Sequence, residues 1–114
     1  MIDMATKREQ WFQALQDLGC IVCLNEMNIR SEPDIHHIHR NNRRVDDFHT
    51  IPLCPSHHRL GIRNDVAVSR HPWKREFERR YGTEWELFEQ TKQRVEVLLQ
   101  MRQVVPRRDD ETEG

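Results

Sequence analysis

The chain has 114 residues, of which 36% are hydrophobic and 32% charged, a composition that fits one small domain rather than a disordered chain. No apolar run approaches the roughly 20 residues of a membrane-spanning helix, and no basic-then-apolar signal peptide opens the chain. Three cysteines, an odd number, argue against a closed disulfide framework and fit a reducing cytosol. We therefore expect a cytoplasmic protein, and a bound metal would add to the stability of so small a core.

The net charge of −1 hides an uneven distribution of charge along the chain. Four acidic residues follow Pro106, and without them 18 basic residues face 15 acidic ones. Ten Lys and Arg but only five Asp and Glu lie between His37 and Arg80. Such a run alone is typical of a solvated surface, but beside metal-ligand residues it favours phosphate binding. We expect one domain at residues 1–105 and a flexible acidic tail at 106–114.

The first predicted element is a helix over residues 7–18. Thr6 and Glu9 form a capping-box pattern at its start. Gly19 is well placed to end the helix in a left-handed conformation. Four apolar residues at helical spacing predict the buried stripe of the helix: Trp11, Phe12, Leu15 and Leu18.

The middle of the chain predicts two short antiparallel strands. Residues 20–23 indicate a tight turn, and residues 24–33, which lack periodicity, indicate a loop. A strand is expected over 35–39, followed by a polar turn at 40–44 and a second strand over 48–53.

Three further segments complete the chain. Pro55 favours a short helix over 56–60, and residues 61–70 are expected to be irregular, with Val66 and Val68 inward. A helix opening at 71–73 and ending at Gly82 places three aromatic residues on one face: Trp73, Phe77 and Tyr81. A second capping box, Thr83 with Glu86, begins a last helix to about Gln103, whose inward residues are expected to be Leu87, Phe88, Val95, Leu98 and Leu99.

Two ligand pairs predict a structural zinc site. Cys20-x-x-Cys23 and Cys54-x-x-His57 have the two-residue gap that lets both side chains of a knuckle face one ion. Thiolate and imidazole ligands suit zinc, and all three cysteines are used. The alternatives are three buried apolar cysteines or a redox Cys-x-x-Cys, although no thioredoxin-like βαβ pattern surrounds the pair.

All seven histidines lie between positions 36 and 71, and their order is similar to that of the HNH, or ββα-metal, endonucleases. That family has a knuckle, a His or acidic residue before a His, an Asn, and a strand ending in Cys-x-x-Cys/His-His. Here the pattern reads Cys20-Ile-Val-Cys23, His36-His37, His49 and Ile51-Pro-Leu-Cys54 with His57-His58. The resemblance implies an α+β fold: a ββα-metal core stapled by zinc, one N-terminal helix and two C-terminal helices.

The resemblance also implies roles for the histidines. His37 would be the general base that polarises a water, and His36 and His58 would hold a catalytic divalent metal, Mg²⁺ or Mn²⁺. His71 is the candidate third ligand, with a helix N-cap before Pro72 as the alternative. His49 stands where the family has Asn and would help to fix the loop that carries the base. The expected products are a 5′-phosphate and a 3′-hydroxyl.

Several longer phrases resemble one branch of this group, the phage recombination-enhancement (Ref) nucleases. They are Leu18-Gly-Cys-Ile-Val-Cys23, Asp34-Ile-His-His-Ile38, Ile51-Pro-Leu-Cys-Pro-Ser-His-His-Arg59, Trp73 and Tyr81-Gly-Thr-Glu84. The resemblance implies a phage or prophage protein in a bacterial cytoplasm, acting in recombination or repair on DNA in a RecA filament.

DNA contacts are expected from seven basic residues: Arg40, Arg43, Arg44, Arg59, Arg63, Lys74 and Arg75. Such contacts are salt-sensitive and largely indifferent to sequence. Two other readings stay open: a zinc-stapled nucleic-acid-binding module without catalysis, and a nuclease directed at RNA. A pure binding module needs the zinc ligands but not the second cluster at His36, His37 and His58. The sequence leaves the oligomeric state open.

Overall fold

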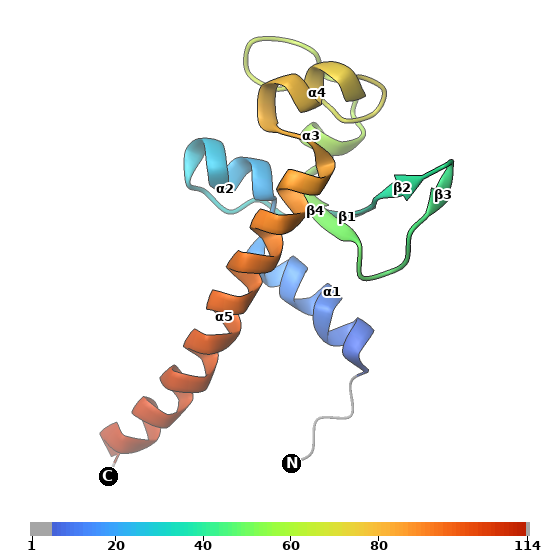
Figure 1. The fold of residues 1–114 in the computed structure, drawn as a ribbon. Helices are drawn as coiled ribbons and strands as arrows, with labels where there is room; N and C mark the ends of the chain where they lie inside the picture. The colour runs from blue at the N-terminus through green and yellow to red at the C-terminus, as the bar shows by residue number, and fades with distance from the viewer. Residues whose placement is uncertain (1–5, 114) are drawn as a thin grey trace.

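The computed structural model describes the backbone of residues 6–113 and the side chains of residues 6–102. It is a small α+β protein, as predicted, with two short two-stranded sheets among five helices in that part of the chain. A long C-terminal helix, α5, runs along one side, and the sheets and the other helices lie near its N-terminal half (Figure 1). No helix of the described part is both long and apolar enough to cross a membrane.

Helix α1 has the predicted bounds, Lys7–Leu18, and the predicted capping box. The Thr6 hydroxyl accepts from the Glu9 amide at 3.1 Å, and the Glu9 carboxylate accepts from the Thr6 amide at 2.9 Å. Gly19 ends the helix with φ of 88°, although its ψ of −179° is extended rather than left-handed helical. A side chain at Gly19 would collide with Arg30, whose Cγ lies 2.5 Å from the ideal Cβ position.

Residues 21–27 form a helix, α2 (Ile21–Met27), where a turn and a loop were expected. The prediction was wrong because seven residues are too few to show a periodic apolar stripe. The helix is fixed instead by its ends: the Cys20 Sγ accepts from the Cys23 amide, and Asn28 closes it in the left-handed conformation.

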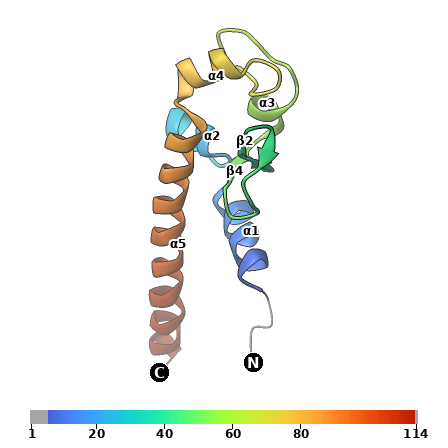
Figure 2. The same ribbon diagram turned by 45° about the vertical axis from the view of Figure 1, so that its right-hand side comes forward.

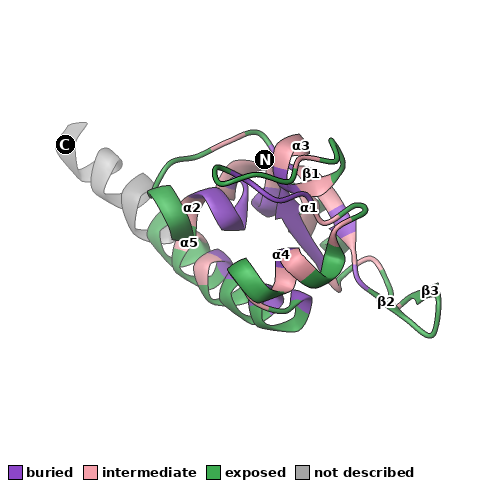
Figure 3. Ribbon diagram, turned by 90° about the horizontal axis from the view of Figure 1, so that it is seen from above, coloured by how far each residue is buried: buried purple, intermediate pink, exposed green. Residues whose placement is uncertain are grey.

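Strands β1 (Asp34–His37) and β4 (Thr50–Leu53) pair antiparallel, as predicted, with His36 opposite Ile51. The segment between them contains a hairpin of β2 (His39–Arg40) and β3 (Arg43–Arg44). Asn41 and Asn42 both have positive φ, as a two-residue hairpin turn requires. The hairpin projects away from the body and is exposed (Figures 1 and 3).

Helix α3 (Pro55–His58) follows β4 directly, so β1, β4 and α3 form a ββα unit. Residues 59–73 are irregular, as predicted for most of them, with one bridge between Arg63 and Val68. Val68 is buried, but Val66 is 82% exposed, so the inward placement of Val66 was wrong. Helix α4 (Lys74–Tyr81) ends at Gly82, and its Phe77 is fully buried.

Helix α5 has the bounds Glu84–Glu113 and continues past its expected end near Gln103; the first glycine after Gly82 is Gly114. The predicted capping box is present between Thr83 and Glu86. Leu87, Phe88 and Val95 are buried, but Leu99 is 45% exposed because it lines an open groove between α1 and α5. The predicted acidic tail falls on side chains outside the described residues and stays a prediction.

The core has two parts. One joins α2, the β1–β4 sheet, α4 and the start of α5 through Ile21, Ile51, Phe77, Leu87 and their neighbours. The other joins α1 to α5 through Ala14, Leu15 and Val95. The two helices lie side by side in Figure 2, and the sheet is held between them and α3.

Candidate active site

Four predicted zinc ligands meet beneath the β1–β4 sheet. The Nδ1 of His57 lies 3.3 Å from the Sγ of Cys54, 3.6 Å from that of Cys23 and 3.7 Å from that of Cys20. The Sγ atoms of Cys23 and Cys54 are 3.8 Å apart. Ligands about 2.0–2.3 Å from a tetrahedral ion lie roughly 3.3–3.8 Å from one another. The buried Cys₃His cluster can therefore hold a structural metal such as zinc.

Two helix starts position these four residues. Cys20 precedes α2 and Cys54 precedes α3, so each helix turns its second ligand back towards the first. The neighbouring thiol of Cys20 lowers the pKa of Cys54 to about 3, while the same contact and burial raise the pKa of Cys20. The lowered pKa favours the thiolate form of Cys54, and the thiolate is the form that binds metal.

Three histidines form a second cluster: His36 on β1, His58 on α3 and His71 in the following loop. One ring nitrogen from each lies within 4.8 Å of the other two. The Nδ1 of His36 is 3.3 Å from the Nε2 of His58, a spacing that two imidazoles on one metal ion adopt. The His71 amide donates to the carbonyl of His58 at 2.8 Å, which fixes the loop against α3.

His36 and His58 each have one ring nitrogen within hydrogen-bond distance of a carboxylate. Glu84 Oε2 is 2.9 Å from His36 Nε2, and Asp34 Oδ2 is 2.9 Å from His58 Nδ1. A carboxylate can only accept a hydrogen bond, so the ring nitrogen that faces it carries the proton. The other nitrogen of each ring keeps a free electron pair. Those free nitrogens are the pair that face each other. Arg70 also donates to Glu84.

The electrostatics of this cluster favour neutral imidazoles. Burial lowers the pKa of His36, and burial together with the Arg70 guanidinium lowers the pKa of His71 to about 4. Burial raises the pKa of Glu84, but hydrogen bonds from His36 and Arg70 outweigh it and bring that pKa to about 2. The lowered pKa values thus favour neutral rings at His36 and His71 beside a charged Glu84, as in metal sites whose ligand histidines are oriented by carboxylates.

The family model described as "Recombination enhancement, RecA-dependent nuclease" matches residues 4–96, which include both clusters. The chain belongs to this family. No curated protein and no solved structure matches it significantly. Membership supports nuclease activity in recombination and agrees with the resemblance in the phrases around the cysteines and histidines.

His37, the predicted general base, has its own carboxylate partner. Its Nε2 lies 3.1 Å from Asp47 Oδ1, and Asp47 also pairs with Arg8. The ring stands edge-on to Phe12 and is half-buried. Since neighbouring residues of a strand face opposite sides, His37 is turned away from the cluster that contains His36.

His49, at the family's Asn position, fixes the loop before β4. Its Nδ1 lies 2.7 Å from Asp46 Oδ1, which also accepts from the amides of Phe48 and His49. The ring packs against Trp85 and Phe88 of α5. These contacts fit the loop-fixing role, and a direct part for His49 in the chemistry remains a prediction.

The seven predicted DNA-binding residues lie in two groups. Arg40, Arg43 and Arg44 are exposed on the β2–β3 hairpin. The other group lies in the loop after α3 and on α4: Arg59, Arg63, Lys74 and Arg75. In this group Arg59 pairs with Asp34 and Arg63 with Glu76.

Sequence reasoning missed the carboxylates that orient the histidines: Glu84, Asp47 and, in this role, Asp34. Glu84 is 48 positions from His36, so no spacing rule connects them. The burial that reveals its role, with Glu84 only 4% exposed, is visible in the structure and not in the sequence.

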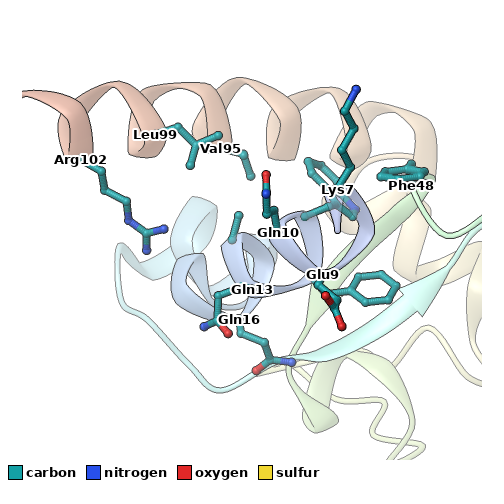
Figure 4. Close-up of a pocket in the computed structure, with 12 residues that line it drawn as sticks. Lys7, Glu9, Gln10, Gln13, Gln16, Phe48, Val95, Leu99 and Arg102 are labelled. Atoms are coloured by element: carbon teal, nitrogen blue, oxygen red, sulfur yellow. The ribbon is translucent and has the colours of Figure 1, made fainter. Parts of the chain in front are cut away.

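A groove of about 850 Å³ lies between α1 and α5, lined in part by Lys7, Phe48, Val95, Leu99 and Arg102 (Figure 4). None of the clustered histidines or cysteines lines it. The groove is therefore separate from the candidate site.

Proposed function

We propose that the protein is a metal-dependent endonuclease of the HNH, or ββα-metal, type that hydrolyses DNA phosphodiester bonds. The observation that carries this proposal is the convergence of His36, His58 and His71, two of them oriented by carboxylates, on a ββα unit. A module that only binds nucleic acid needs the Cys₃His site but has no use for this second cluster.

The donor set of the second cluster fits a divalent cation. Three neutral imidazoles suit transition-metal ions, whereas Mg²⁺ prefers oxygen ligands. A cation held there would neutralise charge on the phosphate and on the leaving oxygen. We therefore expect Mn²⁺, Co²⁺ or Ni²⁺ to support activity at least as well as Mg²⁺.

His37 has the arrangement that a general base requires. Asp47 accepts a hydrogen bond from its Nε2, which leaves Nδ1 unprotonated and able to take a proton from water. The water oxygen then bonds to phosphorus while the bond from phosphorus to the 3′-oxygen breaks, and that oxygen takes a proton from solvent. The products are a 5′-phosphate and a 3′-hydroxyl.

We propose DNA as the substrate, held by its phosphates and located by a RecA filament. The family description supports RecA dependence, and the exposed arginines of the hairpin support backbone contacts that do not read sequence. A phage or prophage origin follows from the resemblance in the sequence alone.

The test is a nicking assay on a displacement loop formed by RecA and an oligonucleotide, with Mg²⁺, Mn²⁺ or Ni²⁺ added. His37→Ala should reduce the cleavage rate at least about a hundredfold, the usual contribution of a general base. His39→Ala is the matched control. His39 is an exposed histidine two residues after His37, and its Nδ1 contacts the backbone carbonyl of His37 rather than its ring.

Equal rates for His37→Ala and wild type, with zinc content and folding unchanged, would remove His37 from the role of base. If wild-type protein binds the displacement loop but never cuts it with any of the three cations, the binding-module function replaces the endonuclease.

A further inference from the structure

Trp85 is an exposed indole next to the candidate active site. It is the second residue of α5, it follows Glu84, and it is 37% exposed. The guanidinium of Arg40, next to the turn of the β2–β3 hairpin, lies 5.2 Å from the centre of its ring. The His49 ring stands edge-on to it at 5.6 Å.

Aromatic rings and cations alternate around Trp85, and one of the rings, Phe88, is buried beside it. Phe88, one turn along α5, contacts the Trp85 ring edge-on, and the Lys92 ammonium lies 5.1 Å from the Phe88 ring centre. We call this strip the Trp85 platform; it consists of Arg40, His49, Trp85, Phe88 and Lys92.

The cations of the hairpin are not neutralised within the protein. Arg40, Arg43 and Arg44 are exposed, and among the residues with described side chains none of the three forms an ion pair with a carboxylate. The nearby acids of the 46–47 loop are engaged elsewhere, Asp46 with His49 and Asp47 with His37 and Arg8. The hairpin therefore presents positive charge to an anionic partner beside the partly exposed Trp85 ring, over which Arg40 lies.

We propose that the Trp85 platform binds an unpaired base of single-stranded DNA at the edge of the active site. Phosphate contacts alone need no indole, whereas surfaces for single strands combine stacking aromatics with cations that follow the backbone. The base would stack on the indole, and Arg40 would turn to the adjoining phosphate. Bases within a duplex are stacked on one another and cannot use the platform.

This inference rests on the proposed function, because it places the single strand beside the proposed cleavage site. The link is covalent and short: Glu84, which orients His36, is the residue before Trp85. A single strand held on the platform would thus lie next to the histidine cluster. The displaced strand of a displacement loop is unpaired in this way.

The experiment measures binding without cleavage, with no divalent cation added beyond the bound zinc. Fluorescence anisotropy gives the affinity for a fluorescein-labelled 15-nucleotide oligo(dT) and for a 15-base-pair duplex. Trp85→Leu should weaken binding of the single strand about tenfold or more, the cost of losing one stacked base, and weaken duplex binding less than about threefold, because phosphate contacts dominate there.

Two further variants make the result specific. Trp85→Phe keeps a ring and should stay within about threefold of wild type on the single strand, since stacking tolerates any aromatic face. Phe48→Leu is the matched control, because Phe48 is a similarly exposed ring, 43%, that lines the α1–α5 groove instead. It should leave both affinities unchanged.

A second readout uses only proteins that retain the ring. A single 2-aminopurine placed in the oligonucleotide should lose fluorescence on binding to wild type, because stacking on the indole quenches it. If Trp85→Leu fails to fold, this quenching decides the question, and its absence in bound complexes overturns the proposal.

The proposal is also overturned if Trp85→Leu binds the single strand as tightly as wild type does. It is likewise overturned if the variant loses affinity for single strand and duplex equally, because Trp85 would then only support Arg40. Failure of the platform is separable from failure of the endonuclease. Loss of single-strand binding in Trp85→Leu supports the platform even if no cleavage is seen, and cleavage with unaltered single-strand binding supports only the endonuclease.

Discussion

Glu84 ties the last helix to the histidine cluster. It is almost fully buried, it accepts from His36 Nε2 at 2.9 Å and it pairs with Arg70. A buried carboxylate in this position keeps its charge because both partners donate to it, and it fixes the tautomer in which His36 offers Nδ1 to a metal.

Glu84→Gln should lower the affinity of the histidine cluster for a divalent cation about tenfold to a hundredfold, the usual cost of losing an outer carboxylate. The measurement is isothermal titration of tag-free protein with Ni²⁺. Glu89→Gln is the control, since Glu89 is an exposed carboxylate on the same helix that pairs only with Lys92. Unchanged Ni²⁺ affinity in Glu84→Gln, with normal zinc content, would contradict the role assigned to Glu84.

Asp47 plays the corresponding part for His37. Asp47→Asn should lower kcat roughly tenfold or more and leave KM within about twofold, because a neutral amide no longer selects the tautomer that leaves Nδ1 free, while the DNA contacts remain. Arg8→Gln removes the other partner of Asp47 and keeps its 3.1 Å contact with His37. Steady-state cleavage of the displacement loop compares the two, and a change confined to KM in Asp47→Asn would count against an orienting role.

At the scale of elements, the Cys₃His cluster joins two short helices that local interactions alone would not hold. Helices α2 and α3 have seven and four residues, well below the length at which isolated helices are stable. Both carry ligands at their first turns, so a metal there would anchor α3 and, through His58, one wall of the histidine cluster.

Cys54→Ser should abolish stoichiometric zinc binding and lower the thermal unfolding midpoint by about 10 °C or more, because a loss of a few kcal/mol shifts the midpoint of a domain this small by that much. Elemental analysis and circular dichroism provide the readouts. Wild type depleted by a chelator should show the same drop and recover when zinc is returned. Full stability of the depleted protein would instead mean that the cysteines are ordinary buried apolar residues.

The sequence predicted the elements whose signals are local. The capping boxes at Thr6 and Thr83 and the helix stops at Gly19 and Gly82 lie within four residues of the features they define. Helix α2 was missed because its seven residues are too few to show periodicity, and the contacts at its two ends fix it instead. Leu99 was predicted to face inward from its helical phase, but phase cannot reveal that this position lines an open groove.

The candidate site shows the same difference between motifs that are local in the sequence and contacts between residues far apart in it. Spacing predicted the Cys20–Cys23 and Cys54–His57 pairs, and the family resemblance implied the second set of histidine ligands; the members of each set meet in the structure. The orienting contacts were not readable, because Asp34 with His58 and Glu84 with His36 join residues 24 and 48 positions apart. Only the fold brings such pairs into contact.

On the scale of the whole molecule, the charge is poorly suited to holding free DNA. The net charge is −1, and two of the seven predicted DNA-binding residues, Arg59 and Arg63, are already paired with carboxylates of the protein. Few phosphate contacts mean weak affinity at physiological salt, on the order of 10⁻⁴–10⁻⁶ M for non-specific binding. A second protein that concentrates and opens the DNA would compensate, and the family description names RecA.

We therefore expect cleavage to require the filament. In reactions with circular duplex DNA, RecA, a nucleotide cofactor and a homologous oligonucleotide, cutting should fall within the paired region and be at least about tenfold faster than without RecA, because the filament replaces a binding energy that the small domain lacks. A heterologous oligonucleotide, which loads RecA without forming a displacement loop, is the control. Equal cutting of free plasmid at physiological salt would show that the domain holds DNA unaided, and its exposed arginines would then suffice for recruitment.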